Sequence, residues 1–305
     1  MKVATRLLGF CLLLAVAFGV AVAVGGATDV KPKHGGHSGD AMSDMPGMSA
    51  DAHGGDAHGG DAMSDMPGMS TAGGELPPGL AVAQGDVRLV PERTTFQAGR
   101  AAPFRFQIVD KQGRAVRDFD VEHTKRMHLI AVRRDYAGYQ HVHPVMADDG
   151  TWSVPLRFDD AGVYRVFADF QLPGVGKTVL ATDVFVPGDF QPQAVPAPVE
   201  RTSVDGYDVT IRGAPRAGSE GTLTFAVSRE GKPVAVQPYL GADGHLVALR
   251  DGDLAYLHVH PQETPGSGGP IVFMTEYPSV GTYRLFLQFK HENRIHTAAF
   301  TQEVK

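Results

Sequence analysis

The chain has 305 residues, a formal net charge of −6 and a single cysteine. This length allows two domains of ordinary size. No basic patch or stripe is present, which argues against nucleic acid as a partner. One cysteine excludes a disulfide framework within the chain, so its stability has to come from burial of apolar side chains.

The first 27 residues are typical of an export signal. Lys2 and Arg6 precede an apolar run over residues 7–24, and small residues follow it. A positive start, an apolar stretch and small residues describe a secretory leader. The run has 18 residues, which is also close to the length that spans a bilayer. We therefore expect residues 1–27 to be a signal peptide or an N-terminal membrane anchor. The rest of the chain is then extracytoplasmic, either secreted or held at the cell envelope.

Residues 28–78 are rich in Gly, Asp, His, Met, Ser and Ala and nearly free of large aliphatic side chains. Such a segment cannot bury enough apolar surface to offset its ordering entropy, so we expect it to be disordered. A stretch of 11 residues that begins at Gly39 recurs at Gly60, 21 residues later. Prolines within both copies make a stable helix unfavourable.

Six of the ten methionines fall in this segment, in two groups with the spacing M-x-x-M-x-x-M. Methionine fills gaps in folded cores, but this segment has no core. Thioether sulfur is a soft ligand that selects Cu(I), and nearby imidazoles suit Cu(II) or Zn(II). The segment predicts a copper-binding tail, and a solubilising spacer that arose by duplication is the alternative. The predicted tail ligands are Met42, Met45, Met48, Met63, Met66, Met69, His53 and His58.

From about residue 79 the sequence consists of short strand-like runs separated by Gly and Asp turns. Alternation of period two, with turns every 8 to 12 residues or so, is typical of a β-sandwich. The second half then repeats the first, and four prolines between residues 187 and 198 mark a stiff connection. We predict an all-β chain with two tandem immunoglobulin-like β-sandwich domains, at 79–188 and 200–305, joined by a Pro-rich linker at 189–199.

Each repeat contains a His-Val-His triplet with a further histidine 13 residues before it. Residues i and i+2 of a strand point to one face, about 6.6 Å apart, so two imidazoles can converge on one ion. The alternative is that these imidazoles bond to the following loop and brace the sandwich. We expect the second repeat to offer the better site, because His296 can complete a four-histidine cluster there. The candidate ligands are His128, His141 and His143 in the first repeat, and His245, His258, His260 and His296 in the second.

Several segments resemble the small exported immunoglobulin-like domains of bacterial metal-handling proteins. They are Phe96-Gln-Ala-Gly through Gly113, His128, His141-Val-His143-Pro144 and Gly162-Val-Tyr-Arg. The families that these segments resemble are the YtkA-like and CopC-like families. The resemblance implies a sandwich of seven strands or a similar number in the bacterial envelope, with copper as its ligand. A CopC-type carrier would also use a histidine near its mature N-terminus. Here a tail of about 50 residues precedes the first domain, so copper in the domains follows from the histidine spacing.

The sequence predicts an extracytoplasmic metal-binding protein whose ion is copper, with zinc as the second choice. Its role would be copper buffering, resistance or delivery, with a membrane copper transporter or oxidase as partner. We expect no enzyme, because phosphate-cradling and G-x-S-x-G motifs are absent and a mature chain without cysteine excludes blue copper. Two alternatives stay open. One is a structural or protein-interaction module of the envelope, and the other is a hydrolytic or redox enzyme with a three-histidine centre.

Overall fold

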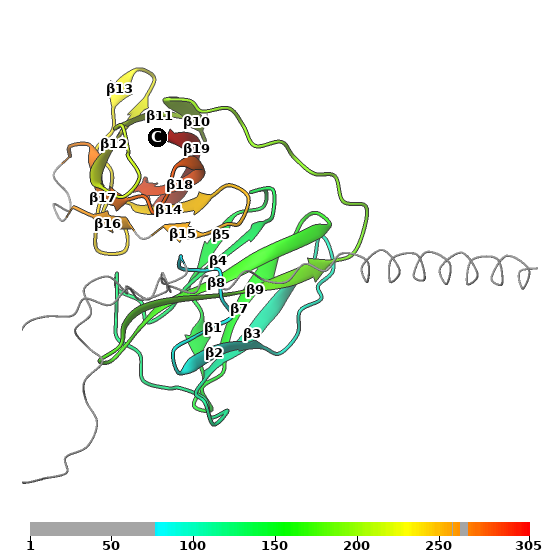
Figure 1. Cartoon of the computed structure of the whole chain (residues 1–305). Helices are drawn as coiled ribbons and strands as arrows, with labels where there is room; N and C mark the ends of the chain where they lie inside the picture. The colour runs from blue at the N-terminus through cyan, green and yellow to red at the C-terminus, as the bar shows by residue number, and fades with distance from the viewer. Residues whose placement is uncertain (1–76, 258, 263–267) are drawn as a thin grey trace, which may run out of the picture. The chain divides into compact units, whose positions relative to one another are not determined.

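The computed structural model describes residues 77–257, 259–262 and 268–305. The predicted leader and all but the last two residues of the predicted metal-binding tail lie outside this part of the chain. All the regular elements in these ranges are β-strands, and among them no helix is long and apolar enough to span a membrane. The strands form two tandem immunoglobulin-like β-sandwiches, which confirms the predicted fold (Figure 1).

The first sandwich has one sheet in the order β1-β2-β3-β7-β6 and a second in the order β5-β4-β8-β9, all antiparallel. Its strands are β1 (Ala83–Gln84), β2 (Val87–Pro91), β3 (Ala101–Val109), β4 (His128–Arg133), β5 (Gln140–Val142), β6 (Val145–Met146), β7 (Trp152–Arg157), β8 (Gly162–Leu172) and β9 (Gly176–Val186).

The second sandwich repeats this plan, with one sheet in the order β10-β11-β12-β17-β16, to which β13 adds beside β12, and another in the order β15-β14-β18-β19. Its strands are β10 (Arg201–Val204), β11 (Tyr207–Arg212), β12 (Glu220–Arg229), β13 (Lys232–Pro233), β14 (His245–Arg250), β15 (Tyr256–Leu257), β16 (Val259–Pro261), β17 (Ile271–Glu276), β18 (Gly281–His291) and β19 (Arg294–Val304).

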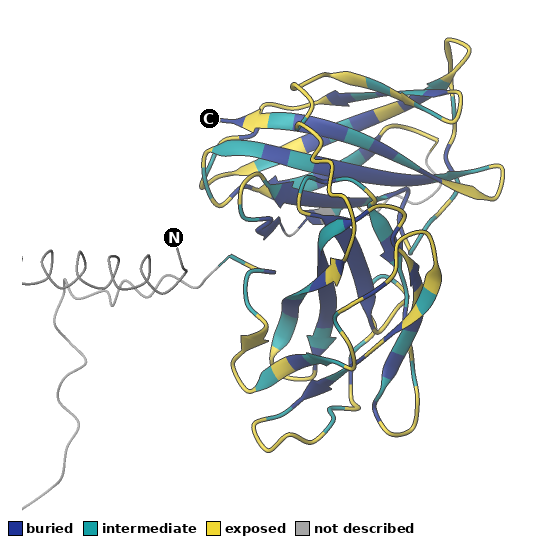
Figure 2. Ribbon diagram, turned by 90° about the vertical axis from the view of Figure 1, so that its right-hand side faces the viewer, coloured by how far each residue is buried: buried dark blue, intermediate teal, exposed yellow. Residues whose placement is uncertain are grey.

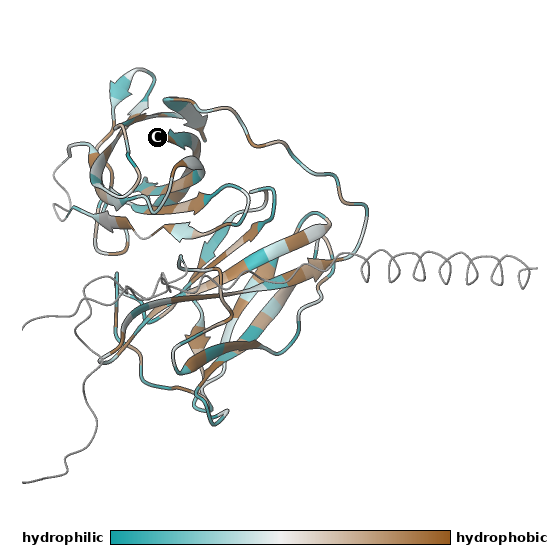
Figure 3. Cartoon of the chain, in the orientation of Figure 1, coloured by the Kyte–Doolittle hydropathy of each residue, from teal (hydrophilic) through white to brown (hydrophobic). Residues whose placement is uncertain are grey.

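Each sandwich encloses an apolar core of its own. Strand β7 shows how the pattern produces it: Trp152, Val154 and Leu156 are buried, while the residues between them are partly or fully exposed. Side chains alternate between the faces of a strand, so one face of the sheet meets the core and the other meets water. Buried residues accordingly follow the strands and exposed residues follow the turns (Figure 2), and apolar and polar residues alternate along many strands (Figure 3).

Strands β4 and β14 depart from this alternation, because apolar residues on both of their faces are buried. Their second faces meet in a third apolar cluster, which contains Ile130 and Val132 from β4 and Val247 and Leu249 from β14. The sheet β5-β4-β8-β9 therefore packs against the sheet β15-β14-β18-β19. Polar residues that lie on these two faces are buried at the same junction.

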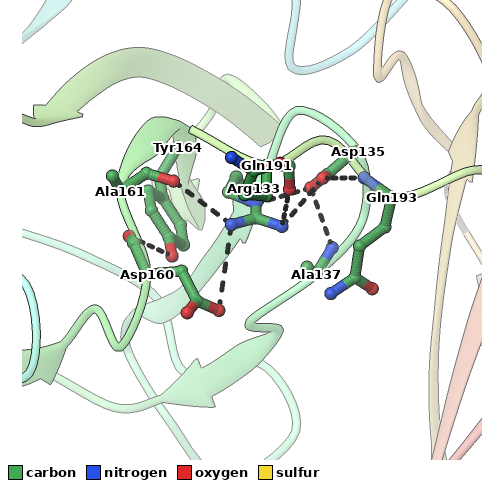
Figure 4. A network of polar contacts seen from close by, with 8 residues as sticks. All are labelled: Arg133, Asp135, Ala137, Asp160, Ala161, Tyr164, Gln191 and Gln193. Atoms are coloured by element: carbon green, nitrogen blue, oxygen red, sulfur yellow. Dashed lines mark hydrogen bonds and ion pairs between the residues drawn. The ribbon is translucent and has the colours of Figure 1, made fainter. Parts of the chain in front are cut away.

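The start of the linker is fastened to the first sandwich by a buried arginine (Figure 4). Arg133 is 2% exposed and donates two hydrogen bonds to the Asp135 carboxylate, at 2.7 and 2.9 Å. It also donates to the carbonyls of Ala161 and Gln191, and Asp135 accepts a bond from the Gln193 backbone N–H. A buried charge is stable only when it is paired and hydrogen-bonded, and this pair meets that condition while it holds the linker.

Candidate metal centre

Three histidines of the first repeat come together at one end of the junction between the sheets. His128 begins β4, His141 lies in the neighbouring strand β5, and His143 follows two residues later. One ring nitrogen from each lies within 4.8 Å of the others. His128 and His141 are buried, and His143 is partly exposed. The i, i+2 spacing thus places both members of the His-Val-His triplet on the same side, as strand geometry requires.

The outer ring nitrogens of this group face hydrogen-bond acceptors. His128 Nε2 lies 3.1 Å from the Glu122 carbonyl oxygen, and His141 Nδ1 lies 2.7 Å from Gln288 Oε1. An oxygen can only accept a hydrogen bond, so with the Gln288 amide in this orientation each of these nitrogens is the one that carries the proton. A neutral imidazole has one N–H only, so the inner nitrogens, His128 Nδ1 and His141 Nε2, both present lone pairs. They face each other at 3.1 Å.

Two lone pairs at this distance repel each other, and a positive charge between them would relieve the repulsion. A proton is disfavoured, because burial away from water lowers the pKa of His141 to about 3 and that of His143 to about 4. Burial also lowers the pKa of His128. A metal ion fits better: with bonds of about 2.0 Å, two nitrogens 3.1 Å apart subtend roughly 100° at the ion, near the tetrahedral angle.

The second repeat supplies the partner of His141, which sequence analysis missed. Gln288 lies in β18, and its side chain is 6% exposed. A histidine that binds a metal usually donates its other N–H to a carbonyl or carboxylate, which fixes the ring and its tautomer. The Glu122 carbonyl and Gln288 Oε1 both act in this way on the cluster. The position of Gln288 opposite His245, in register across β14 and β18, is visible only once the strands are paired.

Asp169 is the second residue that the sequence did not reveal. It pairs with His128 across β4 and β8, so both side chains lie on the junction face. The Asp169 carboxylate accepts a bond of 3.0 Å from the Tyr256 hydroxyl of the other sandwich. Burial raises the pKa of Asp169, and Lys177, whose Nζ lies 3.6 Å away, lowers it in part. A buried carboxylate thus stands on the same face as the histidines.

A surface cavity of about 350 Å³ leads to the cluster from outside. Thr124, Lys125, Met127 and Trp152 line it together with His143. His143 Nε2 is buried and has no hydrogen-bond partner among the described residues. His143 therefore belongs both to the wall of the cavity and to the histidine cluster.

His245 of the second repeat lies against the cluster of the first. Its ring centroid is 4.4 Å from that of His141 and 5.5 Å from that of His128. Burial holds the pKa of His245 well below its usual value, with His141 as a further cause. The structure therefore brings His245 to the histidines of the other sandwich.

The expected four-histidine cluster of the second repeat is not formed, because His296 points the other way. His245 pairs with Gln288, whereas His296 pairs with Phe289, one residue further along β18. Neighbouring residues of a strand face opposite sides, so His296 points into the core, with its ring 4.6 Å from that of Tyr207. Its Nδ1 bonds to Asp205 Oδ2 at 2.8 Å. The prediction that His296 joins His245 is therefore wrong.

Of the remaining predicted ligands, His260 is the one whose backbone lies within the described residues. His260 lies in β16, which pairs with β17 in the sheet opposite to that of His245. His258 and the eight predicted tail ligands lie outside the described residues. Met127, which precedes His128, faces the core of the first sandwich and is 1% exposed.

Comparison with known families gives the same division into two repeats. The sequence profile described as "Domain of unknown function (DUF8832)" matches residues 81–186 and again residues 202–305. The chain belongs to the DUF8832 family. Its two copies coincide with the two sandwiches, and the resemblance to YtkA-like and CopC-like proteins stays a prediction. No curated protein shows significant similarity to the chain.

Solved structures show only distant likeness. Alpha-2-macroglobulin of Salmonella, reacted with methylamine, is 14% identical with a TM-score of 0.26, over 75% of this chain and 15% of that one. The adhesin InvE of Yersinia pseudotuberculosis is 11% identical with a TM-score of 0.24, over 72% and 61%. The Escherichia coli adhesin FdeC is 14% identical with a TM-score of 0.24, over 74% and 66%. The chain spans less than two thirds of each, and likeness this weak carries no argument about function.

Proposed function

We propose that this chain is an extracytoplasmic metal-binding protein that holds a copper ion through His128, His141 and His143. Zinc is the second ion that suits three neutral imidazoles. The role is binding, in copper buffering, resistance or delivery, and no reaction is assigned to the site.

The observation that carries this proposal is the pair of inner nitrogens, His128 Nδ1 and His141 Nε2, 3.1 Å apart. Their rings are fixed by acceptors on the far side, so the protonation pattern is the one that a bound metal requires. A purely structural pair would place an N–H of one ring against the lone pair of the other. Here that arrangement would leave an outer nitrogen without its proton, facing an oxygen.

The sequence adds two features from outside the described residues. The methionine groups between Met42 and Met69 supply soft thioether ligands for Cu(I). The apolar run at residues 7–24, as a signal peptide or a membrane anchor, supports a position of the following domains beyond the cytoplasmic membrane. The proposal joins these features: the tail captures Cu(I), and the histidine centre holds copper in the folded part.

The test is a competition titration of the full chain with Cu(II), compared with the variants His128→Gln and His291→Gln. His291 lies at the end of β18 and bonds to the Tyr207 hydroxyl, so it is the control for loss of an imidazole elsewhere. We expect the wild type and His291→Gln to bind one equivalent tightly. The His128→Gln variant should lose affinity for that equivalent at least 100-fold.

The tail is tested on the same chain with all six of its methionines changed to leucine. Under reducing conditions this variant should bind fewer Cu(I) ions than the wild type. If His128→Gln and the wild type bind Cu(II) equally, the histidine centre is not a copper site. The alternative of an interaction module of the envelope would then take its place.

A further inference from the structure

The two sandwiches contact each other through equivalent residues. Tyr139 of the first repeat stacks on Phe286 of the second, with ring centroids 4.0 Å apart and planes at 8°. In the reverse sense, Tyr256 of the second repeat contacts Phe167 of the first, at 5.6 Å. Tyr139 corresponds to Tyr256 and Phe167 to Phe286 in the sequence repeat. The two contacts are therefore reciprocal, as in an interface with two-fold symmetry.

His128 and His245 are also equivalent, since each begins the first strand of its junction sheet. Their rings stack on each other, with centroids 5.5 Å apart and planes at 12°. A residue that contacts its own equivalent lies beside the symmetry axis. The histidine cluster therefore lies where both repeats can contribute to one site.

The spacing of the three first-repeat rings, and of His245 with two of them, is close to that of a four-histidine site. With metal–nitrogen bonds of about 2 Å, the centroids of tetrahedrally arranged imidazoles lie about 5 Å from one another. Within the first repeat the three centroid distances are 5.3, 5.0 and 4.9 Å. The distances from His245 to His141 and His128, 4.4 and 5.5 Å, fall on either side of that value.

One ring nitrogen of His245 is available to bind an ion. Its Nδ1 is buried and makes no hydrogen bond to any described residue. A buried polar atom without a partner is unfavourable unless a ligand or another polar group satisfies it.

We propose that His245 is the fourth ligand of the copper ion, so that one ion is held jointly by the two sandwiches. This inference rests on the proposed copper site and adds that both sandwiches supply ligands to it. The two domains then bind one ion together, instead of one ion each. Binding of the ion and packing of the two sheets stabilise each other, because ligands come from both sides of the junction.

The test counts nitrogen ligands by electron paramagnetic resonance of the full chain with one equivalent of Cu(II). Each coordinated imidazole nitrogen adds to the superhyperfine splitting. We compare the wild type with His245→Asn, which keeps a polar group where Nδ1 lies, with His245→Gln, and with the control His291→Gln. The wild type and the control should show four nitrogens. Both His245 variants should show three and bind copper at least 10-fold more weakly.

Three nitrogens in the wild type, with affinity unchanged in both His245 variants, would overturn the shared site and leave the copper site of the first repeat standing. A wild type whose copper binding is unaffected by His128→Gln would overturn both proposals. If His245→Asn is poorly folded, His245→Gln and the nitrogen count of the wild type still decide between these outcomes.

Discussion

The two repeats carry the same histidine pattern. Among the described residues, the first brings its upstream histidine and its triplet together, whereas His260 of the second lies in the sheet opposite to that of His245. In the first repeat β5 extends to Val142 and keeps His141 beside His128. In the second, β15 ends at Leu257, and β16 already belongs to the opposite sheet at Val259. The chain thus crosses between the sheets about two residues earlier. A duplicated motif therefore conserves spacing along the chain, but the point of crossing decides which side chains meet.

The largest expected difference between the two repeats comes from replacing one histidine in each by glutamine. His141→Gln should lower the affinity for Cu(II) at least 100-fold, because it removes a ligand from a three-histidine set. His296→Gln should leave the affinity within about three-fold, since His296 faces the core and bonds to Asp205. It should instead lower the free energy of unfolding by roughly 1–3 kcal/mol. Metal titration and urea unfolding measure both effects, and a large loss of affinity in His296→Gln would contradict the assignment.

The support that the second repeat gives to the first can be measured at Gln288. Gln288→Ala removes the acceptor of the His141 Nδ1–H, so the ring loses its fixed tautomer. Loss of such a supporting bond commonly costs 10- to 100-fold in metal affinity, and we expect about 10-fold here. Gln237→Ala is the matched control, because Gln237 accepts a bond from the Asn293 backbone N–H, away from the cluster. Equal affinity in both variants would show that Gln288 does not orient the site.

The buried histidines also predict how stability depends on pH in the metal-free chain. His141 and His143 have pKa values of about 3 and about 4 when folded, against an ordinary value near 6.5 in the unfolded chain. Between these values the unfolded chain binds more protons, so stability is full above about pH 6.5 and falls as the pH decreases. Each such histidine contributes up to about 1.4 kcal/mol per pH unit.

Urea unfolding of the metal-free chain at several pH values measures this slope. His141→Gln should reduce it by close to one histidine's share. A wild-type slope near zero between about pH 6 and pH 4.5 would mean that the cluster is charged or exposed in the folded chain.

Much of the fold follows from the sequence, because alternating strands and a long repeat carry strong signals. The buried junction was not predicted, although its signal is present. His128–Arg133 and His245–Arg250 have continuous apolar interiors, whereas Trp152–Arg157 alternates. A strand covered on both faces has no water-facing side and hence no need for polar residues at alternate positions.

The candidate site, like the fold, could be predicted from the sequence only in part. The meeting of His128, His141 and His143 was predictable, since it needs only the two-residue period of a strand and one turn. The roles of Gln288 and Asp169 were not predictable, because they depend on strand register and on contacts between sandwiches. His296 was misplaced for the same reason: a shift of one residue in register turns a side chain to the other face.

The most direct test of the central claim is a crystal structure of the copper-loaded protein, with diffraction measured at the copper absorption edge. The account predicts an anomalous peak about 2 Å from both His128 Nδ1 and His141 Nε2. Copper peaks at other places in the ordered part of the chain, with none between these two nitrogens, would contradict it.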